Sequence, residues 1–497
     1  MLKPTRPSRP MVTCALAAMR TLRCRYRIRV ARACRAGHLY NTRGPGHNGP
    51  GHQRMHFFYS LLTAAALTLL APYFLVRGLR EGKYLHSLRE RFGFLPRALG
   101  TDSTQPRKTI WLHAVSVGEL LAGLPLARAL GEQYADHRLL ISTTTRTAQE
   151  LARQRCTFAD GIFYFPLDWA WVVRRVFDAL RPNLVVILET ELWPNFLRQA
   201  RRAAVPVVFV NGRISERSLT RALRLARWCP PLRTFYRRVL EEGTLYLMQS
   251  EADAERLRRL GAPGERVHVA GNLKFDFEPP PPPAFVVWLE QQLARQPGRP
   301  LLVAGSVVAG EEEAVLEAFE QVRRQWPQAL LVLAPRKPER FAIAAELAVH
   351  RGHVVRRRSQ LGAAAALDHA ADVLLLDSMG ELAALYRLAD AVFIGGSLVP
   401  AGGHNLLEPA WFGRVPIFGP HMNNFRAVAD AFLQAGAALC VRDAAQLGRV
   451  WTELLADRAR RERLGQAARA LLEQNRGATM RALKAITDIL AVQAVRR

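Results

Sequence analysis

Short apolar runs alternate with longer amphipathic stretches along most of the chain. The apolar runs are typical of buried strands, and the amphipathic stretches, such as Leu120–Leu130, are typical of helices. This alternation predicts parallel sheets that are covered by helices. The expected strands are Thr109–His113, Arg138–Ser142, Leu184–Leu188, Val207–Val210, Thr244–Met248, Leu301–Ala304, Ala329–Leu333, Asp372–Leu376, Ala391–Ile394 and Val415–Phe418.

Five consecutive prolines, Pro279–Pro283, interrupt the alternation near the middle of the chain. Such a run is extended and semi-rigid, so it predicts an interdomain linker. The 497 residues, 49% of them hydrophobic, suffice for two cores of ordinary size. We therefore expect two doubly wound α/β domains, over 81–278 and 284–497, that face a cleft and carry ligands at the carboxyl ends of their strands.

An uncharged segment of twenty residues, Phe57–Val76, precedes the first domain. A helix of this length spans about 30 Å, the hydrocarbon thickness of a bilayer. Basic residues such as Arg77, Arg80 and Lys83 follow at once, which predicts a membrane anchor over 57–80 with the domains on the cytoplasmic side. A cleaved signal peptide is the alternative, although no small-residue cleavage site stands out after the apolar run.

Charge is distributed unevenly along the chain, whose formal net charge is +28. Residues 1–54 hold twelve Lys or Arg and no Asp or Glu, and we expect this leader to be disordered. One hypothesis is that Met55 is the true start; an organelle presequence is the alternative. Residues 55–497 carry the remaining net charge of +16. This charge suits binding to anionic lipid headgroups or to a phosphorylated acceptor and does not require a nucleic acid.

Three polar motifs follow expected strands of the first domain. Glu119, in HAVSVGE, lies in the first turn of an expected helix, where it is placed either to accept a proton or merely to complement the helix dipole. Glu189 and Glu191, in ETELWPN, come after a very apolar strand and either line a site or mark a helix start. Arg213 and Lys274 are cations that an anionic substrate would attract.

Further polar loops, in the second domain, also follow expected strands. A glycine-rich stretch from Gly395 to Pro409 would let the backbone approach a phosphate, and Glu408 would accept hydrogen bonds from ribose hydroxyls. Arg336 is placed to pair with phosphate, and Met379–Glu381 form a further loop at the same edge. The motifs Asp-x-Asp, HExxH, Cys-x-x-Cys and GxxxxGK[ST] are missing, and no GxGxxG fingerprint follows the first expected strand, which weakens metal-dependent, P-loop and dehydrogenase interpretations.

Together these motifs resemble one family, the 3-deoxy-D-manno-octulosonic acid (Kdo) transferases of lipopolysaccharide synthesis. The resemblance covers about residues 55–480 and leaves the leader without a counterpart. The matching segments, in family order, are HAVSVGE (His113–Glu119), ETELWPN (Glu189–Asn195), NGRIS (Asn211–Ser215), GNLKFD (Gly271–Asp276), PRKPERF (Pro335–Phe341), DSMGEL (Asp377–Leu382), GGHNLLEPA (Gly403–Ala410) and FGPHMNNF (Phe418–Phe425).

The resemblance implies a GT-B glycosyltransferase of the inner membrane, with two Rossmann-like domains, an N-terminal acceptor domain and a C-terminal CMP-Kdo domain. It implies inverting, metal-independent transfer of Kdo, without a cofactor, from CMP-Kdo to the tetraacylated, bis-phosphorylated glucosamine-disaccharide precursor of lipid A, with release of CMP. Glu119 matches the family's general base, and Glu189, Glu191 and Lys274 lie near the reacting centre. The positions that match CMP contacts are Pro335, Arg336, Met379, Gly380, Glu381, Asn405, Leu406, Leu407 and Glu408.

Two other functions stay open at this point. One is a metal-independent GT-B transferase that uses a UDP-sugar at the membrane. The other is a basic, membrane-tethered binding module that recognises anionic lipid or nucleic acid without chemistry, although the charge distribution argues against a nucleic-acid partner. The number of Kdo units added and the oligomeric state are likewise left open by the sequence.

Overall fold

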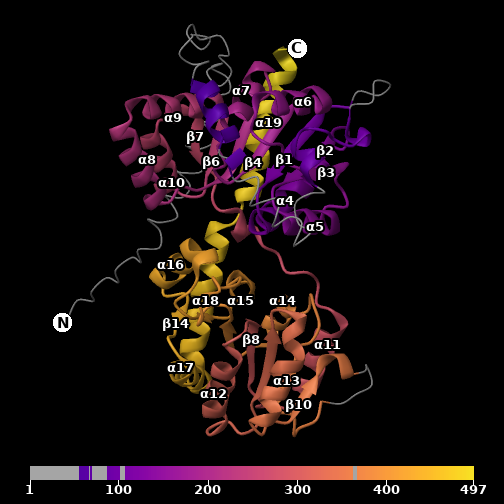
Figure 1. Cartoon of the computed structure of the whole chain (residues 1–497). Helices are drawn as coiled ribbons and strands as arrows, with labels where there is room; N and C mark the ends of the chain where they lie inside the picture. The colour runs from indigo at the N-terminus through magenta and orange to yellow at the C-terminus, as the bar shows by residue number, and fades with distance from the viewer. Residues whose placement is uncertain (1–54, 66–67, 70–86, 101–106, 362–366, 497) are drawn as a thin grey trace, which may run out of the picture. The chain divides into compact units, whose positions relative to one another are not determined.

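The computed structural model describes residues 55–65, 68–69, 87–100, 107–361 and 367–496. The chain forms two compact units (Figure 1). The first contains the described residues up to Asp276 together with those from Gly477 onward, and the second spans Phe277–Arg476. The chain passes from the first unit to the second just before the proline run.

Each unit is built on a seven-stranded, wholly parallel sheet. In spatial order, the first sheet consists of β3 (Gly161–Tyr164), β2 (Arg138–Thr143), β1 (Thr109–Ala114), β4 (Leu184–Leu188), β5 (Val207–Gly212), β6 (Leu245–Met248) and β7 (Val267–Val269). The second consists of β10 (Val355–Arg357), β11 (Val373–Leu375), β9 (Leu330–Pro335), β8 (Leu301–Val307), β12 (Ala391–Ile394), β13 (Pro416–Phe418) and β14 (Leu439–Cys440).

All ten strands expected from the apolar runs are present, and their ends agree with the expected ends to within about three residues. The four strands that the pattern did not predict, β3, β7, β10 and β14, are the edge strands of the two sheets. Each has two to four residues, and most of these residues are only partly buried. An edge strand is covered less completely than a central one, so its sequence lacks the continuous apolar run that reveals a central parallel strand.

Helices cover the sheets as the alternation requires. From Leu88 onward, the α-helices of the first unit are α3 (Leu88–Arg91), α4 (Val117–Gln133), α5 (Arg146–Arg155), α6 (Ala170–Leu180), α7 (Pro194–Arg202), α8 (Glu216–Trp228), α9 (Pro230–Glu242), α10 (Glu251–Leu260) and α19 (Ala478–Arg496). Those of the second are α11 (Ala284–Ala294), α12 (Glu312–Arg323), α13 (Phe341–His350), α14 (Leu382–Leu385), α15 (Leu407–Trp411), α16 (Arg426–Gln434), α17 (Ala444–Ala456) and α18 (Arg458–Asn475).

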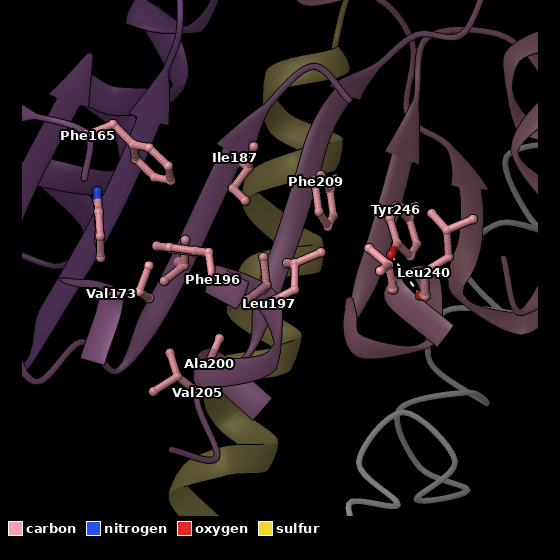
Figure 2. Close-up of a cluster of buried hydrophobic side chains, with 14 of the residues drawn as sticks. Phe165, Val173, Ile187, Phe196, Leu197, Ala200, Val205, Phe209, Leu240 and Tyr246 are labelled. Carbon is pink, nitrogen blue, oxygen red and sulfur yellow. Dashed lines mark hydrogen bonds between the residues drawn. The ribbon is translucent and has the colours of Figure 1, made fainter. Parts of the chain in front are cut away.

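Successive side chains of a central strand enter two different cores, one on each face of the first sheet. Val185 and Ile187 of β4 belong to a cluster with side chains of α6, α7, α9 and α10, whereas Val186 belongs to a cluster with side chains of α4, α5 and α19. Figure 2 shows the first cluster, with the C-terminal helix behind the strands. Trp111 of β1 is fully buried there against Phe196, and its indole N–H donates to the Ser142 hydroxyl over 2.7 Å.

The C-terminal helix α19 corrects the predicted domain boundary. The sequence places residues 284–497 in one domain, but α19 belongs to the first unit. Its buried residues Ala482, Ile486 and Ile489 complete the core that Leu112 and Leu126 form on the first sheet. Asp276 is the last residue of the first unit before the chain enters the second. Its carboxylate accepts hydrogen bonds from the amides of Gly477 and Thr479, where the chain returns to the first unit. The apolar face of α19 is too similar to that of any packed helix for the sequence to show which sheet it covers.

The predicted anchor over 57–80 lies mostly outside the described residues, as does the whole leader 1–54. Residues 55–65 are helical and pack on the first unit, where His56 is buried against Phe235 and Ser60 accepts a hydrogen bond from the side chain of Asn195 over 2.9 Å. Within the described ranges, no helix has both the length and the apolar character needed to cross a bilayer.

Replacing Ile486 of α19 with alanine should destabilise the first unit by about 2–4 kcal/mol, because a fully buried side chain leaves a cavity. Val495→Ala is the matched control, since Val495 lies on the same helix and is 89% exposed. Urea unfolding of the full chain, followed by tryptophan fluorescence, measures both. Equal midpoints for the two variants would mean that α19 does not complete this core.

Candidate active site

The order of strands in the first sheet reverses between β1 and β4, which are direct neighbours. In doubly wound folds, ligands bind outside the carboxyl ends of the strands at such a reversal. Two loops lie there, the one that joins β1 to α4 and the one that joins β4 to α7. Glu119 directly follows the first loop, in the first turn of α4, and Glu189 and Glu191 lie in the second loop. The topology therefore brings together acidic residues that are about 70 positions apart in the sequence.

Glu119 occupies the first turn of α4 and is only 8% exposed. Its carboxylate accepts hydrogen bonds from the amide of Val115 and the hydroxyl of Ser116, each over 2.8 Å, while the amide of Glu119 donates back to the Ser116 oxygen. This is a variant of the capping box. Burial outweighs these hydrogen bonds and raises the pKa of Glu119 to about 7, with smaller contributions from Glu189 and Glu191. The carboxylate therefore both caps the helix and has the pKa of a base that operates near neutrality.

The charges of Glu189, Glu191, Lys274 and Arg213 act on one another at this edge. Burial raises the pKa of Glu189, and nearby Lys274 and Arg213 oppose that shift. Burial also raises the pKa of Glu191, with a further contribution from Glu189. For Lys274, burial lowers the pKa, while Glu189 and Glu119 oppose the change. The four predicted catalytic residues of the first domain therefore form one electrostatic cluster.

Strained backbone and side-chain hydrogen bonds hold the loops of this cluster in place. Glu189 and Asn211 have positive φ values of 60° and 62°, which non-glycine residues rarely adopt. The carbonyl oxygen of the Asn211 side chain accepts the amide of Leu273 over 3.0 Å, which fixes the turn that carries Lys274. The hydroxyl of Thr190 accepts the amide of Arg213 over 2.8 Å.

Asn195, the last residue of the ETELWPN motif, has a structural role. Its amide and that of Phe196 donate to the buried carboxylate of Asp168 over 3.1 and 2.7 Å at the start of α7. Its side-chain amide donates to the carbonyl of Asp168 and to the hydroxyl of Ser60. The helix-start interpretation of this motif therefore holds for Pro194 and Asn195, whereas Glu189 and Glu191 lie in the acidic cluster.

The second sheet reverses its strand order between β8 and β12. Three predicted residues, Arg336, Asn405 and Glu408, lie close together after strands of this region. The positive charge of Arg336 opposes the rise in the pKa of Glu408 that burial causes, and that pKa is raised to about 7. Asn405 donates to Glu408 over 3.2 Å and accepts the amide of Leu407 over 3.1 Å.

His404, which the sequence motifs do not mark as a site residue, belongs to the same group. Burial and the charge of Arg336 lower the pKa of His404 to about 4, so the imidazole is neutral at neutral pH. Its ring packs against Gly396, where a Cβ atom would come within 3.0 Å of the imidazole. Glycine at position 396 therefore leaves the space that the ring occupies, and this tertiary contact gives no local signal in the sequence.

The glycine-rich loop differs from the phosphate cradle that the sequence predicts. The amides of Gly396, Ser397 and Leu398 donate to the carboxylate of Glu311, over 2.6, 2.8 and 2.8 Å. These main-chain donors are therefore already occupied by a group of the protein itself. Glu311 was not predicted, because it lies in a run of three glutamates at the start of α12 whose members look alike in sequence.

The predicted loop Met379–Glu381 follows β11, two strands away from β8. The carboxylate of Glu381 is held by Arg358, over 3.0 Å, and by the hydroxyl of Ser378. Met379 is 62% exposed, and Gly380 has a φ of 90° that glycine adopts without strain. Within the described ranges, no group of three or more His, Cys, Asp or Glu side chains is arranged to hold a metal ion.

Comparison with known proteins identifies the family. Residues 86–277 match the family described as 3-Deoxy-D-manno-octulosonic-acid transferase (kdotransferase). The 3-deoxy-D-manno-octulosonic acid transferase of Haemophilus influenzae is 34% identical over 437 residues, which cover 87% of this chain and 98% of that protein. The enzyme of the same name from Bordetella pertussis is 35% identical over 389 residues, which cover 77% and 87%.

A crystal structure of the C-terminal CMP-Kdo binding domain of WaaA from Acinetobacter baumannii is 32% identical. The alignment covers 38% of this chain and 98% of the crystallised chain, with a TM-score of 0.35. The two full-length relatives decide the assignment, because the match extends over nearly all of the Haemophilus protein. The chain belongs to the 3-deoxy-D-manno-octulosonic acid transferase family.

Proposed function

We propose that this protein transfers Kdo from CMP-Kdo to a hydroxyl of the phosphorylated glucosamine-disaccharide precursor of lipid A and releases CMP. The observation that carries the proposal is the position of Glu119, a buried carboxylate with a pKa of about 7 at the strand-order reversal of the first sheet, in a chain of this family. A carboxylate of this pKa is ionised in about half of the molecules at neutral pH and can take a proton from an attacking hydroxyl.

The proposed reaction balances as an inverting substitution at C2 of Kdo. The acceptor oxygen forms the new bond to C2, its proton passes to Glu119, and the bond from C2 to the phosphate oxygen breaks with its electron pair leaving on CMP. Glu189 and Glu191 keep the surroundings of Glu119 negative, which favours proton uptake, and Lys274 partly offsets their charge.

The second unit supplies the donor contacts in this proposal. Arg336 provides the positive charge for the phosphate, and Pro335 precedes it at the end of β9. In the segment from Asn405 to Glu408, the side chains of Leu406 and Leu407 are buried, and those of Asn405 and Glu408 offer polar groups to the nucleoside. Met379, Gly380 and Glu381 form a further wall of the nucleotide site. CMP carries one phosphate, so we propose that these groups serve without a metal ion or a cofactor.

A membrane location is the remaining part of the proposal. The apolar segment 57–80 would anchor the protein in the inner membrane, with the two units on the cytoplasmic side. Exposed apolar side chains support this location: Phe57 and Phe58 are more than 60% exposed on the helix 55–65, and Trp228 is 84% exposed at the end of α8. The exposed arginines Arg221 and Arg224 of α8 would bind anionic lipid headgroups.

The central test measures nucleotide release from a defined lipid acceptor. The purified protein should release CMP from CMP-Kdo, and mass spectrometry should show the acceptor heavier by one or more Kdo units. UDP-sugars, assayed in parallel, should release no UDP above the background without enzyme. Release of UDP but not CMP would favour a different transferase, and release of neither would favour a binding module.

Replacing Glu119 with glutamine should lower kcat by about 10²- to 10⁴-fold, because the amide cannot accept the proton. In the unaltered protein, kcat/KM should rise with pH up to about pH 7 and then level off, since protonation below the pKa of Glu119 removes the base. This acid limb should be absent in the variant, while its affinity for CMP should stay within two-fold. A pH profile that is unchanged in Glu119→Gln would contradict the assignment. Glu132→Gln, on the same helix, is the control.

Binding to lipid vesicles tests the membrane face. The full chain should prefer vesicles that contain anionic lipid over purely zwitterionic ones, and this preference should weaken with salt. The double variant Arg221→Glu and Arg224→Glu should lose at least ten-fold of the preference, at about 1 kcal/mol per removed charge. The control is the double variant Arg153→Glu and Arg155→Glu. These two arginines lie on α5, a helix that packs on the opposite face of the sheet from α8. Equal losses in both double variants would mean that α8 forms no specific lipid contact.

A further inference from the structure

Glu311 is a completely buried carboxylate whose hydrogen-bond partners all belong to the main chain. It is 0% exposed and immediately precedes α12. One oxygen accepts the amides of Val308 and Gly396 over 3.1 and 2.6 Å, and the other accepts those of Ser397 and Leu398 over 2.8 Å each. Within the described part of the chain, no Lys or Arg forms an ion pair with it.

These four amides lie at the place in the second sheet where the strand order reverses. Val308 follows β8, and Gly396–Leu398 follow β12, so the carboxylate bridges the two loops that flank the reversal. Several amides that converge on one point form the kind of cradle that binds anions in other folds. Here the protein fills its own cradle with a carboxylate.

The energetics make this bridge a strong constraint on the loops. Burial of an ionised carboxylate is costly, and four charge-assisted hydrogen bonds offset that cost. Without the carboxylate, the amides of Gly396, Ser397 and Leu398 in the loop after β12 would lose their hydrogen-bond acceptor inside the protein. The loops also pack without spare room, because a Cβ atom on Gly395 would come within 2.4 Å of the carbonyl oxygen of Ser306.

Residues 395–398, the loop that Glu311 holds, form hydrogen bonds with the segment proposed to bind the donor and with the loop after β13. The carbonyl of Gly396 accepts the amide of Gly403 over 2.6 Å, directly before His404 and Asn405. The carbonyl of Ser397 accepts the amide of His421 over 2.9 Å, and its hydroxyl accepts that of Gly419 over 2.8 Å. A displacement of loop 395–398 would therefore displace segment 403–405 as well.

We propose that Glu311 is the positioning residue of the donor site: it acts as a built-in anion that fixes loop 395–398 and, through Gly403, the segment that carries Asn405. The inference rests on the proposed function of the second unit. Because Glu311 occupies the amides of Gly396, Ser397 and Leu398, these donors are not available to the phosphate of the donor substrate, for which the proposed function assigns Arg336. Glu311 itself does not touch the donor.

Steady-state kinetics of the full chain test the proposal. Glutamine at position 311 keeps one acceptor oxygen but turns an N–H₂ group toward two amide donors. Glu311→Gln should therefore raise the KM for CMP-Kdo and the Kd for CMP by about ten-fold or more, as Arg336→Ala should do directly. The KM for the lipid acceptor should stay within two-fold. Glu313→Gln is the matched control, because Glu313 is an exposed neighbour on α12.

A second variant separates positioning from general damage. In Glu311→Ala the cradle is empty, so acetate at about 100 mM should restore CMP affinity and raise the Tm, whereas Glu313→Ala should not respond. Loss of folded protein alone would lower kcat and leave both KM values unchanged. The proposal fails if CMP binding in both Glu311 variants stays within two-fold of the unaltered protein, or if the acceptor KM rises equally. If the unaltered protein releases no CMP, the proposed function fails, while the Tm response to acetate still tests the cradle.

Discussion

Buried carboxylates that accept hydrogen bonds from main-chain amides hold the loops at the carboxyl edges of both sheets. A parallel sheet ends in loops whose amides lie partly inside the protein, and each buried amide needs an acceptor. Glu119, Asp168 and Asp253 supply acceptors around the first sheet, and Glu311 does so in the second. The loops that carry the candidate site residues are consequently held by the protein's own hydrogen bonds, which reduces the ordering that a substrate must impose when it binds.

The hydrogen-bond partners of the buried carboxylates differ between the two units. Glu119 accepts one amide and one hydroxyl and has two other glutamates nearby, so burial dominates and raises its pKa to about 7. Glu311 accepts four amides and thereby joins two loops. The number and type of hydrogen-bond partners therefore distinguish the two buried carboxylates.

Much of the fold could be predicted from the apolar runs, because central parallel strands such as Leu184–Leu188 and Ala391–Ile394 are buried on both faces. Edge strands such as Val355–Arg357 are only partly covered, so they resemble loops in sequence. The acidic cluster could be predicted in part, since Glu119 and Glu189 each follow a central strand. Their proximity depends on the order β1–β4, which follows from the packing of the whole sheet.

The sequence by itself determined the alternation of strands and helices, the positions of polar residues at strand ends and the family motifs, because these depend on neighbouring residues along the chain. Only the tertiary structure decided that α19 completes the first core and that Glu311, rather than Glu313 two residues later, is buried in the amide cradle. It also decided that the pKa of Glu119 is near 7. Burial and the surrounding charges set these properties, and both come from residues that are distant in sequence and adjacent only after the sheets have formed.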